Sequence, residues 1–205
     1  MEYYIHKVPV FLMSLNPPQV NIPEFCQAVE ETVTAPMCRN LDVVYIADIP
    51  ELAGRSATYA HGAIYMSSSE PTVFDMVENF VHEMAHSLES TFGQDIFTEE
   101  LISEFRGKRE RLYQILKAEG FKPSERLFGF TEYTEKMDLY LAEVVGYPTL
   151  LSLTMGLFVS PYGATSLQEY YANGFEKYFL DNPRKVRDTS PVLYNKIVEI
   201  LDELT

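Results

Sequence analysis

The sequence has few cysteines. Cys26 and Cys38 are the only two among 205 residues, and they have neither the Cys-x-x-Cys spacing of a metal site nor the density of a disulfide scaffold. We therefore expect two buried thiols and no disulfide framework. Histidine is also scarce, with four residues, so a pair of histidines at a defined spacing is informative.

Basic residues are outnumbered by acidic ones. Lys and Arg total 16 and Asp and Glu total 30, which gives a formal net charge of -14. No cluster of positive charge is available to neutralise phosphates, so the composition argues against nucleic-acid binding. A basic partner or substrate suits this charge better. The 46% hydrophobic and 22% charged content is typical of a folded globular protein.

Targeting and membrane segments are not recognised either. Residues 1–7 lack the basic leader and apolar core of a secretory signal, so we expect a cytoplasmic or already mature protein. Residues 144–161 carry no charge, but glycines, prolines and polar residues interrupt the run. We expect a buried helix and loop there and no membrane partner. The sequence predicts no oligomeric state.

Strand patterns come before helical patterns along the chain. The expected strands are residues 3–13, ending at 16–18, residues 41–47, and two short pieces within 56–67 around a turn at His61-Gly62. The expected helices are residues 21–34, capped by Asn21, and residues 72–90, 98–119, 134–145, 150–158, 166–180 and 190–201. This order predicts an α+β fold with a small N-terminal mixed sheet packed on one helix, a mostly helical C-terminal lobe, and an active-site cleft between them. We expect one catalytic domain over residues 1–205, with the sheet and its helix at about 1–93 and the helical lobe at about 94–205.

Two of the four histidines form the motif His82-Glu83-Met84-Ala85-His86, within a stretch that has the pattern of an amphipathic helix. Histidines four residues apart project from one helix face, so both imidazoles can bind one tetrahedral zinc ion. Glu83 then stands beside the open coordination position, where it can take a proton from a metal-bound water. We interpret His82 and His86 as metal ligands and Glu83 as the general base. Two chance histidines on a solvated helix are a weak alternative in a chain with so few histidines.

The helix around this motif has a start, a stop and an apolar stripe of its own. Ser69 before Glu70-Pro71 indicates its beginning, and Phe92-Gly93 indicates its end. Its apolar stripe is Val73, Val77, Phe80 or Val81, Met84 and Leu88. Two acids on the helix, Asp75 and Glu89, either orient an imidazole or are ordinary solvated acids.

A catalytic zinc site needs a third protein ligand besides the two histidines. No histidine follows His86, so a carboxylate on a later helix is the remaining donor. Glu169 is the best candidate, because it lies in the first turn of an aromatic-rich helix. Ser166 and Glu169 also have the spacing of a capping box, in which the carboxylate satisfies the backbone of the helix start. The residues alone leave both interpretations open.

A second motif, paired with the first, resembles a known family. His82-Glu83-x-x-His86, together with Tyr162-Gly163-Ala164-Thr165-x-x-x-Glu169-Tyr170-Tyr171-Ala172-x-x-Phe175, is similar to the catalytic domain of anthrax toxin lethal factor and its relatives, the Pro-Pro endopeptidases, which are gluzincin zinc peptidases. The resemblance covers about residues 40–180 and is specific around 77–92 and 160–180. The interval from His86 to Glu169 is longer than the family pattern, which predicts an inserted helical piece within 105–158.

The resemblance implies a role for each matched residue. His82, His86 and Glu169 would bind one zinc ion, and Glu83 would be the general base. Tyr162, seven residues before Glu169, would stabilise the oxyanion. The implied activity is that of a zinc-dependent metalloendopeptidase, which hydrolyses peptide bonds in a peptide or protein substrate by a metal-activated water. Without the resemblance, Tyr162 would be interpreted as a loop tyrosine that covers the core.

The strand just before the motif helix is expected to bind the substrate. In many zinc peptidases this strand is the sheet edge, and Ala63, Ile64, Tyr65 and Met66 occupy that place here. An extended peptide would pair with it through main-chain hydrogen bonds while pockets select alternate side chains. His61, near this strand, fits a turn better than a ligand role.

Two other functions compete with proteolysis for the chain as a whole. The first is a catalytically silent zinc fold that serves as a binding or structural component of a larger assembly. The second is a zinc hydrolase that acts on a non-peptide amide. Metal analysis and a peptide-library cleavage assay separate these hypotheses.

Overall fold

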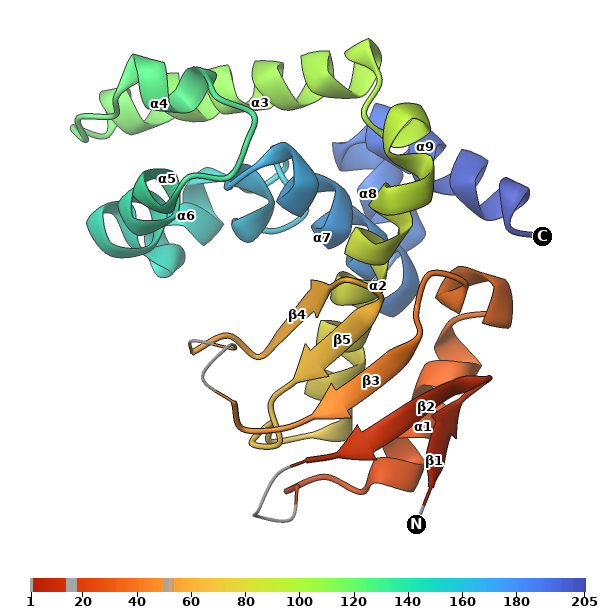
Figure 1. Ribbon diagram of the computed structural model, residues 1–205. Helices are drawn as coiled ribbons and strands as arrows, with labels where there is room; N and C mark the ends of the chain where they lie inside the picture. Colours follow the sequence, from red (N-terminus) through yellow and green to blue (C-terminus); the bar gives the residue numbers. More distant parts are fainter. Residues whose placement is uncertain (1, 14–17, 50–51, 53) are drawn as a thin grey trace. The chain divides into compact units, whose positions relative to one another are not determined.

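The computed structural model describes residues 2–13, 18–49, 52 and 54–205. The chain divides into two units, Met1–Gly93 with Leu201–Thr205 and Gln94–Ile200. The first unit contains a five-stranded sheet, and the second is helical (Figure 1). The prediction of an α+β fold with an N-terminal mixed sheet and a mostly helical remainder is confirmed.

The sheet of the first unit combines parallel and antiparallel pairs in the order β1-β2-β3-β5-β4. Its strands are β1 (Tyr3–Ile5), β2 (Val8–Leu12), β3 (Val43–Ile46), β4 (Ala57–Ala60) and β5 (Ala63–Met66). The pairs β1/β2 and β4/β5 are antiparallel, whereas β2/β3 and β3/β5 are parallel. The parallel strands β2 and β3 are joined through helix α1 (Ile22–Thr32), because parallel neighbours need a crossover connection.

The N-terminal strand pattern folds as a hairpin, so the prediction of one strand over residues 3–13 is wrong. The chain turns between β1 and β2 at His6, which has a φ of 54°. The His6 ring holds this turn, since its Nε2 lies 2.8 Å from the Val33 carbonyl oxygen. The predicted strand end at 16–18 falls largely on residues 14–17, which lie outside the described residues.

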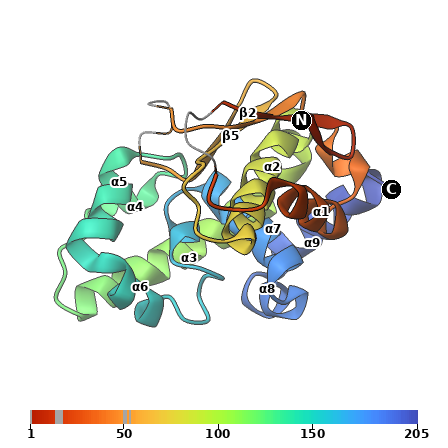
Figure 2. The ribbon, with the colours of Figure 1, turned by 90° about the horizontal axis from the view of Figure 1, so that it is seen from below.

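The two faces of the sheet differ. Figure 2 shows α1 and α2 (Val73–Ile96) on the same side of the strands. The residues that point to this side are at most 2% exposed: Ile5, Val10, Val44, Ile46, Ile64 and Met66. On the other face the rings of Phe11, Tyr45 and Tyr65 stack in a row across β2, β3 and β5, with centroids 6.0 and 5.3 Å apart.

Helix α2 runs from Val73 to Ile96, so the predicted stop at Phe92-Gly93 is wrong. A glycine inside a helix costs about 1 kcal/mol relative to alanine, but Phe92 and Ile96 are both buried and their packing offsets this cost. At the other end, the Thr72 hydroxyl accepts a hydrogen bond from the Asp75 N–H at 3.1 Å.

The second unit contains the long helices predicted from the sequence and two short ones that were not. Its elements are α3 (Glu99–Ala118), α4 (Glu125–Gly129), α5 (Glu135–Leu139), the π-helical η3 (Tyr140–Gly146), α6 (Tyr147–Leu153), the 3-10 turn η4 (Tyr162–Ala164), α7 (Leu167–Leu180), α8 (Pro183–Thr189) and α9 (Pro191–Glu203), whose end belongs to the first unit. Helices α4 and α8 were not predicted. The predicted helix at 134–145 is α5 followed by η3. Across the described residues, no helix is both long and apolar enough to cross a membrane.

The expectation of two buried thiols is confirmed. Cys26 and Cys38 are free and buried. Burial, together with the charge of Glu30, raises the pKa of Cys26 to about 11 and that of Cys38 to about 12. Both thiols are therefore protonated and weakly nucleophilic at neutral pH.

Two glycines give a test of helix packing in the second unit. An added Cβ at Gly174 in α7 would lie 2.9 Å from Cγ of the fully buried Leu193, whereas one at Gly107 in α3 meets nothing within 4 Å. Gly174→Ala should therefore lower the free energy of unfolding by about 1–3 kcal/mol through overpacking. Gly107→Ala should raise it by about 0.5–1 kcal/mol. Urea unfolding measures both, and a stabilising Gly174→Ala would contradict this packing.

Candidate metal centre

His82 and His86 lie one helical turn apart on α2. Their ring centroids are 5.1 Å apart with an interplanar angle of 73°, and both residues are half-buried. Met84 and Ala85, between them in sequence, are fully buried in the core. Because one face of the helix is fixed by packing, the imidazoles on the adjoining face have a rigid support.

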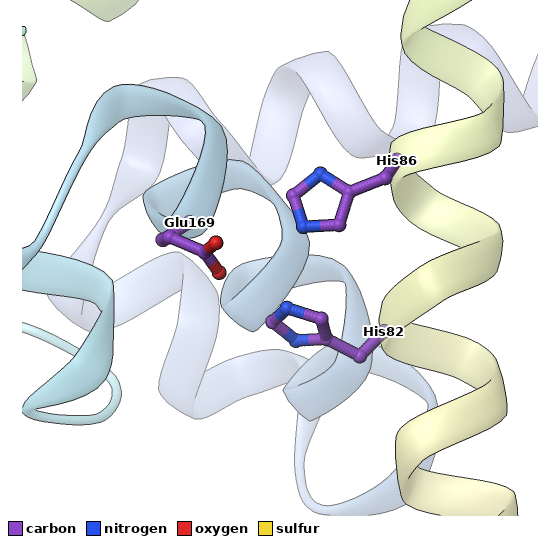
Figure 3. A group of neighbouring side chains, drawn as sticks. All are labelled: His82, His86 and Glu169. Carbon is purple, nitrogen blue, oxygen red and sulfur yellow. The ribbon is translucent and has the colours of Figure 1, made fainter. Parts of the chain in front are cut away.

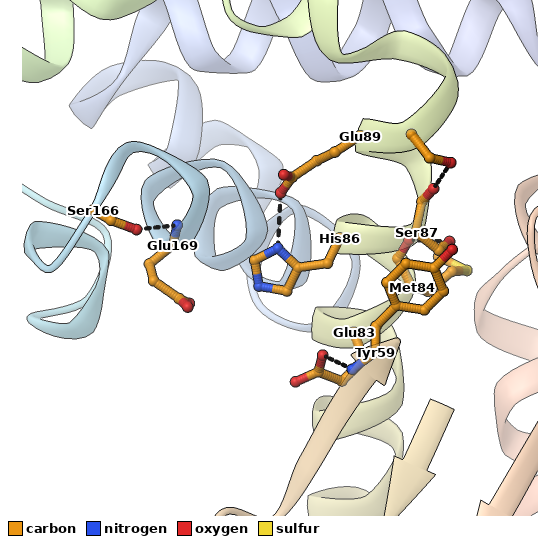
Figure 4. Close-up of polar contacts among 9 residues, drawn as sticks. Tyr59, Glu83, Met84, His86, Ser87, Glu89, Ser166 and Glu169 are labelled. Carbon is orange, nitrogen blue, oxygen red and sulfur yellow. Dashed lines mark hydrogen bonds and ion pairs between the residues drawn. The ribbon is translucent and has the colours of Figure 1, made fainter. Parts of the chain in front are cut away.

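Of the two acids proposed to orient an imidazole, Glu89 contacts a histidine. Its Oε1 lies 2.7 Å from His86 Nδ1 (Figure 4). A carboxylate at Nδ1 favours the proton on that nitrogen, so Nε2 is left with its lone pair to bind a metal. Asp75 has another role, since its carboxylate accepts a hydrogen bond from the Thr72 hydroxyl at 2.6 Å at the start of α2.

The carboxylate of Glu83 is held by the sheet. Its Oε2 accepts a hydrogen bond from the Tyr59 backbone N–H at 2.7 Å (Figure 4). Tyr59 lies in β4, and Glu83 is half-buried. One carboxylate oxygen of the predicted general base is therefore fixed by a main-chain group that no sequence pattern identifies.

Strand β4, and not β5, is at the edge of the sheet. In the strand order β5 lies between β3 and β4, so the expectation that residues 63–67 form the edge is wrong. The reason is that β5 is the inner arm of a hairpin whose turn is made by His61 and Gly62, both with positive φ. The expected turn at His61 is confirmed, and β5 uses its hydrogen-bonding groups on both sides.

The register of this hairpin shows which groups of β4 face outward. Ser67 N–H donates to Ser56 O at 2.8 Å, so residues 56, 58 and 60 are the ones that bond to β5. The main-chain groups of Ala57 and Tyr59 consequently point away from β5. The Tyr59 N–H agrees with this alternation, because it reaches Glu83 and not β5.

An uncharged hollow adjoins β4 on the aromatic face of the sheet. It has a volume of about 540 Å³, and its lining includes Tyr45, Thr58, Ala60 and Tyr65. Thr58 and Ala60 on β4 are small and leave room above the strand. The rings of Tyr45 and Tyr65 are large, so a side chain of a bound molecule that lay over β4 would contact them. The hollow has the size of a small-molecule or side-chain pocket.

Glu169 lies in the first turn of α7. Its backbone N–H donates to Ser166 Oγ at 3.1 Å, which is the serine half of the capping box (Figure 4). The Glu169 side chain belongs to a group with His82 and His86, in which one potential ligand atom from each residue lies within 4.8 Å of the others. Figure 3 shows the carboxylate directed toward the two imidazole rings. The backbone of Glu169 thus serves the cap, while its side chain belongs to a group that could hold a metal ion.

This donor set fits a divalent metal ion. Two imidazole nitrogens and one carboxylate oxygen are the ligands of a three-donor site, and all three residues are half-buried. The contact of Glu89 with His86 Nδ1 is the outer-shell contact that commonly fixes such a ligand. The group His82, His86 and Glu169 could therefore hold a metal ion.

Tyr162 precedes Glu169 in the same unit. It is the first residue of η4, its carbonyl accepts a hydrogen bond from Thr165 N–H at 2.9 Å, and it is half-buried. The turn η4 packs against α7, and an added Cβ at Gly163 would make an ordinary van der Waals contact there, 3.7 Å from the Tyr170 Cα. The segment that begins at Tyr162 therefore lies against α7.

Asn40 supports the motif helix and was not identified from the sequence. Its Nδ2 donates to the Ser87 carbonyl at 2.8 Å, and its Oδ1 accepts from the Thr91 hydroxyl at 3.1 Å. Both partners follow His86 on α2. No local pattern links residues 47 positions apart, so only the fold reveals this contact.

The chain matches no known protein-family model, no curated protein and no solved structure at a significant level. The case for a metal centre therefore depends on the chemistry and geometry of the chain's own residues. These are the donor set, the orienting carboxylate of Glu89 and the anchored carboxylate of Glu83.

Replacing Glu89 tests the orienting contact. Glu89→Ala should weaken metal binding by about 10- to 100-fold, because His86 loses the carboxylate that fixes its tautomer and ring orientation. Asp95→Ala, on an exposed position of the same helix, is the matched control and should bind metal like the parent. Competition with a chromophoric chelator measures both affinities. Equal affinities in the two variants would show that Glu89 does not support a ligand.

Proposed function

We propose that this protein is a zinc-dependent endopeptidase. The observation that carries the proposal is the group of His82, His86 and Glu169, with Glu83 one residue after the first ligand on the same helix. Two histidines and a glutamate are a common ligand set of catalytic zinc in peptidases. The resemblance of the two sequence motifs to the lethal factor family supports the same activity.

One zinc ion would be held by His82, His86 and Glu169. A bound zinc ion supplies Lewis acidity for a carbonyl oxygen and lowers the pKa of its bound water to about 7. The protein has to supply the remaining functions, which are a base, a proton route to the leaving group, a donor to the oxygen that gains charge, and a surface that positions the substrate.

Glu83 has the chemistry of the base. Its Oε2 accepts the Tyr59 N–H, which holds the carboxylate in place to take the proton from the attacking water. The same carboxyl group would then deliver that proton to the amine as the peptide bond breaks.

Tyr162 is proposed as the donor to the carbonyl oxygen that gains negative charge. A tyrosine hydroxyl directed at that oxygen in the transition state is worth about 3–4 kcal/mol, by comparison with other oxyanion-hole donors. The packing of η4 against α7 supports this role, because a donor of this kind must be preorganised.

The outer edge of β4 is proposed to bind the substrate as an added strand. Ala57 offers an outward N–H and C=O, and Tyr59 offers an outward C=O, so an extended peptide can pair there beside Glu83. The hollow over Thr58 and Ala60 would take an uncharged side chain of the peptide. The net charge of -14 favours basic residues elsewhere in the substrate.

Replacing the proposed general base, Glu83, tests the proposed peptidase activity. Glu83→Gln should keep zinc and abolish cleavage of a randomised peptide pool, because an amide cannot accept the proton. His82→Ala should lose both zinc and cleavage, and a chelator should stop the parent protein. Mass spectrometry of the pool with parallel metal analysis measures each outcome, and undiminished cleavage by Glu83→Gln would remove Glu83 from this role.

The same assay separates the competing functions. A parent protein that binds zinc and cuts no member of the pool would favour the silent zinc fold or a non-peptide amide substrate. A parent protein that binds no zinc would contradict the proposal at its first step.

Tyr162→Phe tests the oxyanion donor. Turnover should fall by about 100- to 1,000-fold with little change in metal content, because only the hydroxyl is removed. Tyr133→Phe is the control, since this exposed tyrosine hydroxyl in the same unit donates to Asp138 Oδ2 at 3.0 Å. Steady-state kinetics on a peptide from the pool measures both, and equal turnover in the two variants would exclude Tyr162.

A further inference from the structure

Arg109 is a buried cation held by main-chain carbonyls. It lies in α3 and is 1% exposed. Its Nη1 donates to the carbonyls of Ala164 at 2.7 Å and Thr165 at 3.1 Å, and its Nη2 donates to that of Leu127 at 3.1 Å. Among the described residues, no carboxylate forms an ion pair with it, so its charge is compensated by peptide dipoles.

Aromatic rings fix the orientation of this guanidinium. The rings of Phe105 and Phe128 each have their centroid 5.3 Å from Arg109 Cζ. Burial lowers the pKa of Arg109 to about 10, which leaves the side chain charged at neutral pH. A planar cation between rings, with fixed donors, directs its hydrogen bonds more narrowly than a flexible ammonium can.

The carbonyls that Arg109 binds lie between Tyr162 and Glu169. One peptide group links Arg109 to Tyr162: its N–H, on Thr165, donates to Tyr162 O, and its carbonyl, on Ala164, accepts from Arg109 Nη1. On the other side, Ser166 Oγ accepts the N–H of Glu169. Arg109 therefore holds the joint at which η4 ends and α7 begins.

We propose that Arg109 is a positioning residue that fixes the oxyanion donor Tyr162 relative to the metal ligand Glu169. The inference depends on the proposed function for the roles of these two residues. The structural role of Arg109 does not depend on that function. A buried carbonyl or guanidinium without a hydrogen bond costs free energy, so the connection between η4 and α7 is stable only while Arg109 donates to its carbonyls. Loss of the arginine would therefore loosen this joint.

Lys108 is the matched control on the same helix. It is 9% exposed, and its Nζ donates to the carbonyls of Leu157 and Thr189, each at 2.7 Å. It is thus another buried cation that binds main-chain oxygens in the same unit. The two carbonyls that it binds lie outside the segment from Tyr162 to Glu169, and its Nζ lies 6.0 Å from the ring centroid of Tyr170, directly after that segment. Its loss should therefore cost stability without breaking a hydrogen bond of the segment.

The experiment compares Arg109→Lys, Arg109→Gln and Lys108→Met with the parent protein. Hydrogen exchange of the metal-free proteins should show amides 164–170 exchanging about tenfold faster or more in both Arg109 variants, and at the parent rate in Lys108→Met. Zinc affinity should fall by about 10- to 100-fold in the Arg109 variants only. For a cleaved peptide, kcat should fall with KM nearly unchanged, and Arg109→Lys should recover part of the loss seen in Arg109→Gln.

Two results would overturn the inference. One is a folded Arg109→Lys or Arg109→Gln variant with exchange at 164–170 and zinc affinity like the parent. The other is faster exchange spread evenly over residues 94–200 in the Arg109 and Lys108 variants alike, which would make Arg109 a general stabiliser. Because exchange is read without metal or substrate, this outcome is independent of whether the parent protein cuts any peptide.

Discussion

The proposed metal site depends on the proximity of three side chains, His82, His86 and Glu169. One potential ligand atom from each lies within 4.8 Å of the others. His82 and His86 are neighbours because α2 is a helix, but Glu169 follows His86 by 83 residues and adjoins them only through the fold. Two imidazole nitrogens and a carboxylate oxygen are donors that catalytic zinc uses. The three residues together could therefore hold a divalent ion.

Around this group, the supporting contacts come mainly from backbone atoms and from distant parts of the chain. Glu89 contacts His86, and the Tyr59 N–H donates to Glu83. Asn40 donates to the Ser87 carbonyl in the part of α2 that follows His86. In the second unit, Arg109 binds the carbonyls that precede α7. Each contact limits the motion of one group whose position would matter for the proposed chemistry, as preorganisation requires.

Short-range patterns account for what the sequence predicts well. The motif helix, the Asn21 and Ser166 caps and the turn at His61-Gly62 all depend on residues within a few positions of one another. The α+β fold class follows from strands that precede helices along the chain. For Glu169 the residues alone left a cap and a ligand equally open. In the structure its backbone N–H bonds to the cap residue Ser166, and its side chain lies in a group that could hold a metal ion.

Long-range packing accounts for what the sequence does not predict. Gly93 continues α2 because Phe92 and Ile96 are buried, and β5 is internal because it pairs with β3. The strand pattern at residues 3–13 contains a turn whose His6 ring contacts Val33, a residue on a later segment. The contacts of Tyr59 with Glu83, of Asn40 with Ser87 and of Arg109 with Thr165 join residues 24, 47 and 56 positions apart. Such pairs leave no periodic signal in the sequence.

X-ray absorption at the zinc edge of the metal-loaded protein tests the central claim most directly. The account predicts one zinc ion per chain with two imidazole nitrogens and carboxylate oxygen in its shell at about 2.0–2.2 Å. It also predicts that Glu169→Ala loses the carboxylate oxygen from the shell, while both imidazoles and the bound water remain. A zinc shell that is unchanged by Glu169→Ala, or that lacks the two imidazoles, would contradict the account.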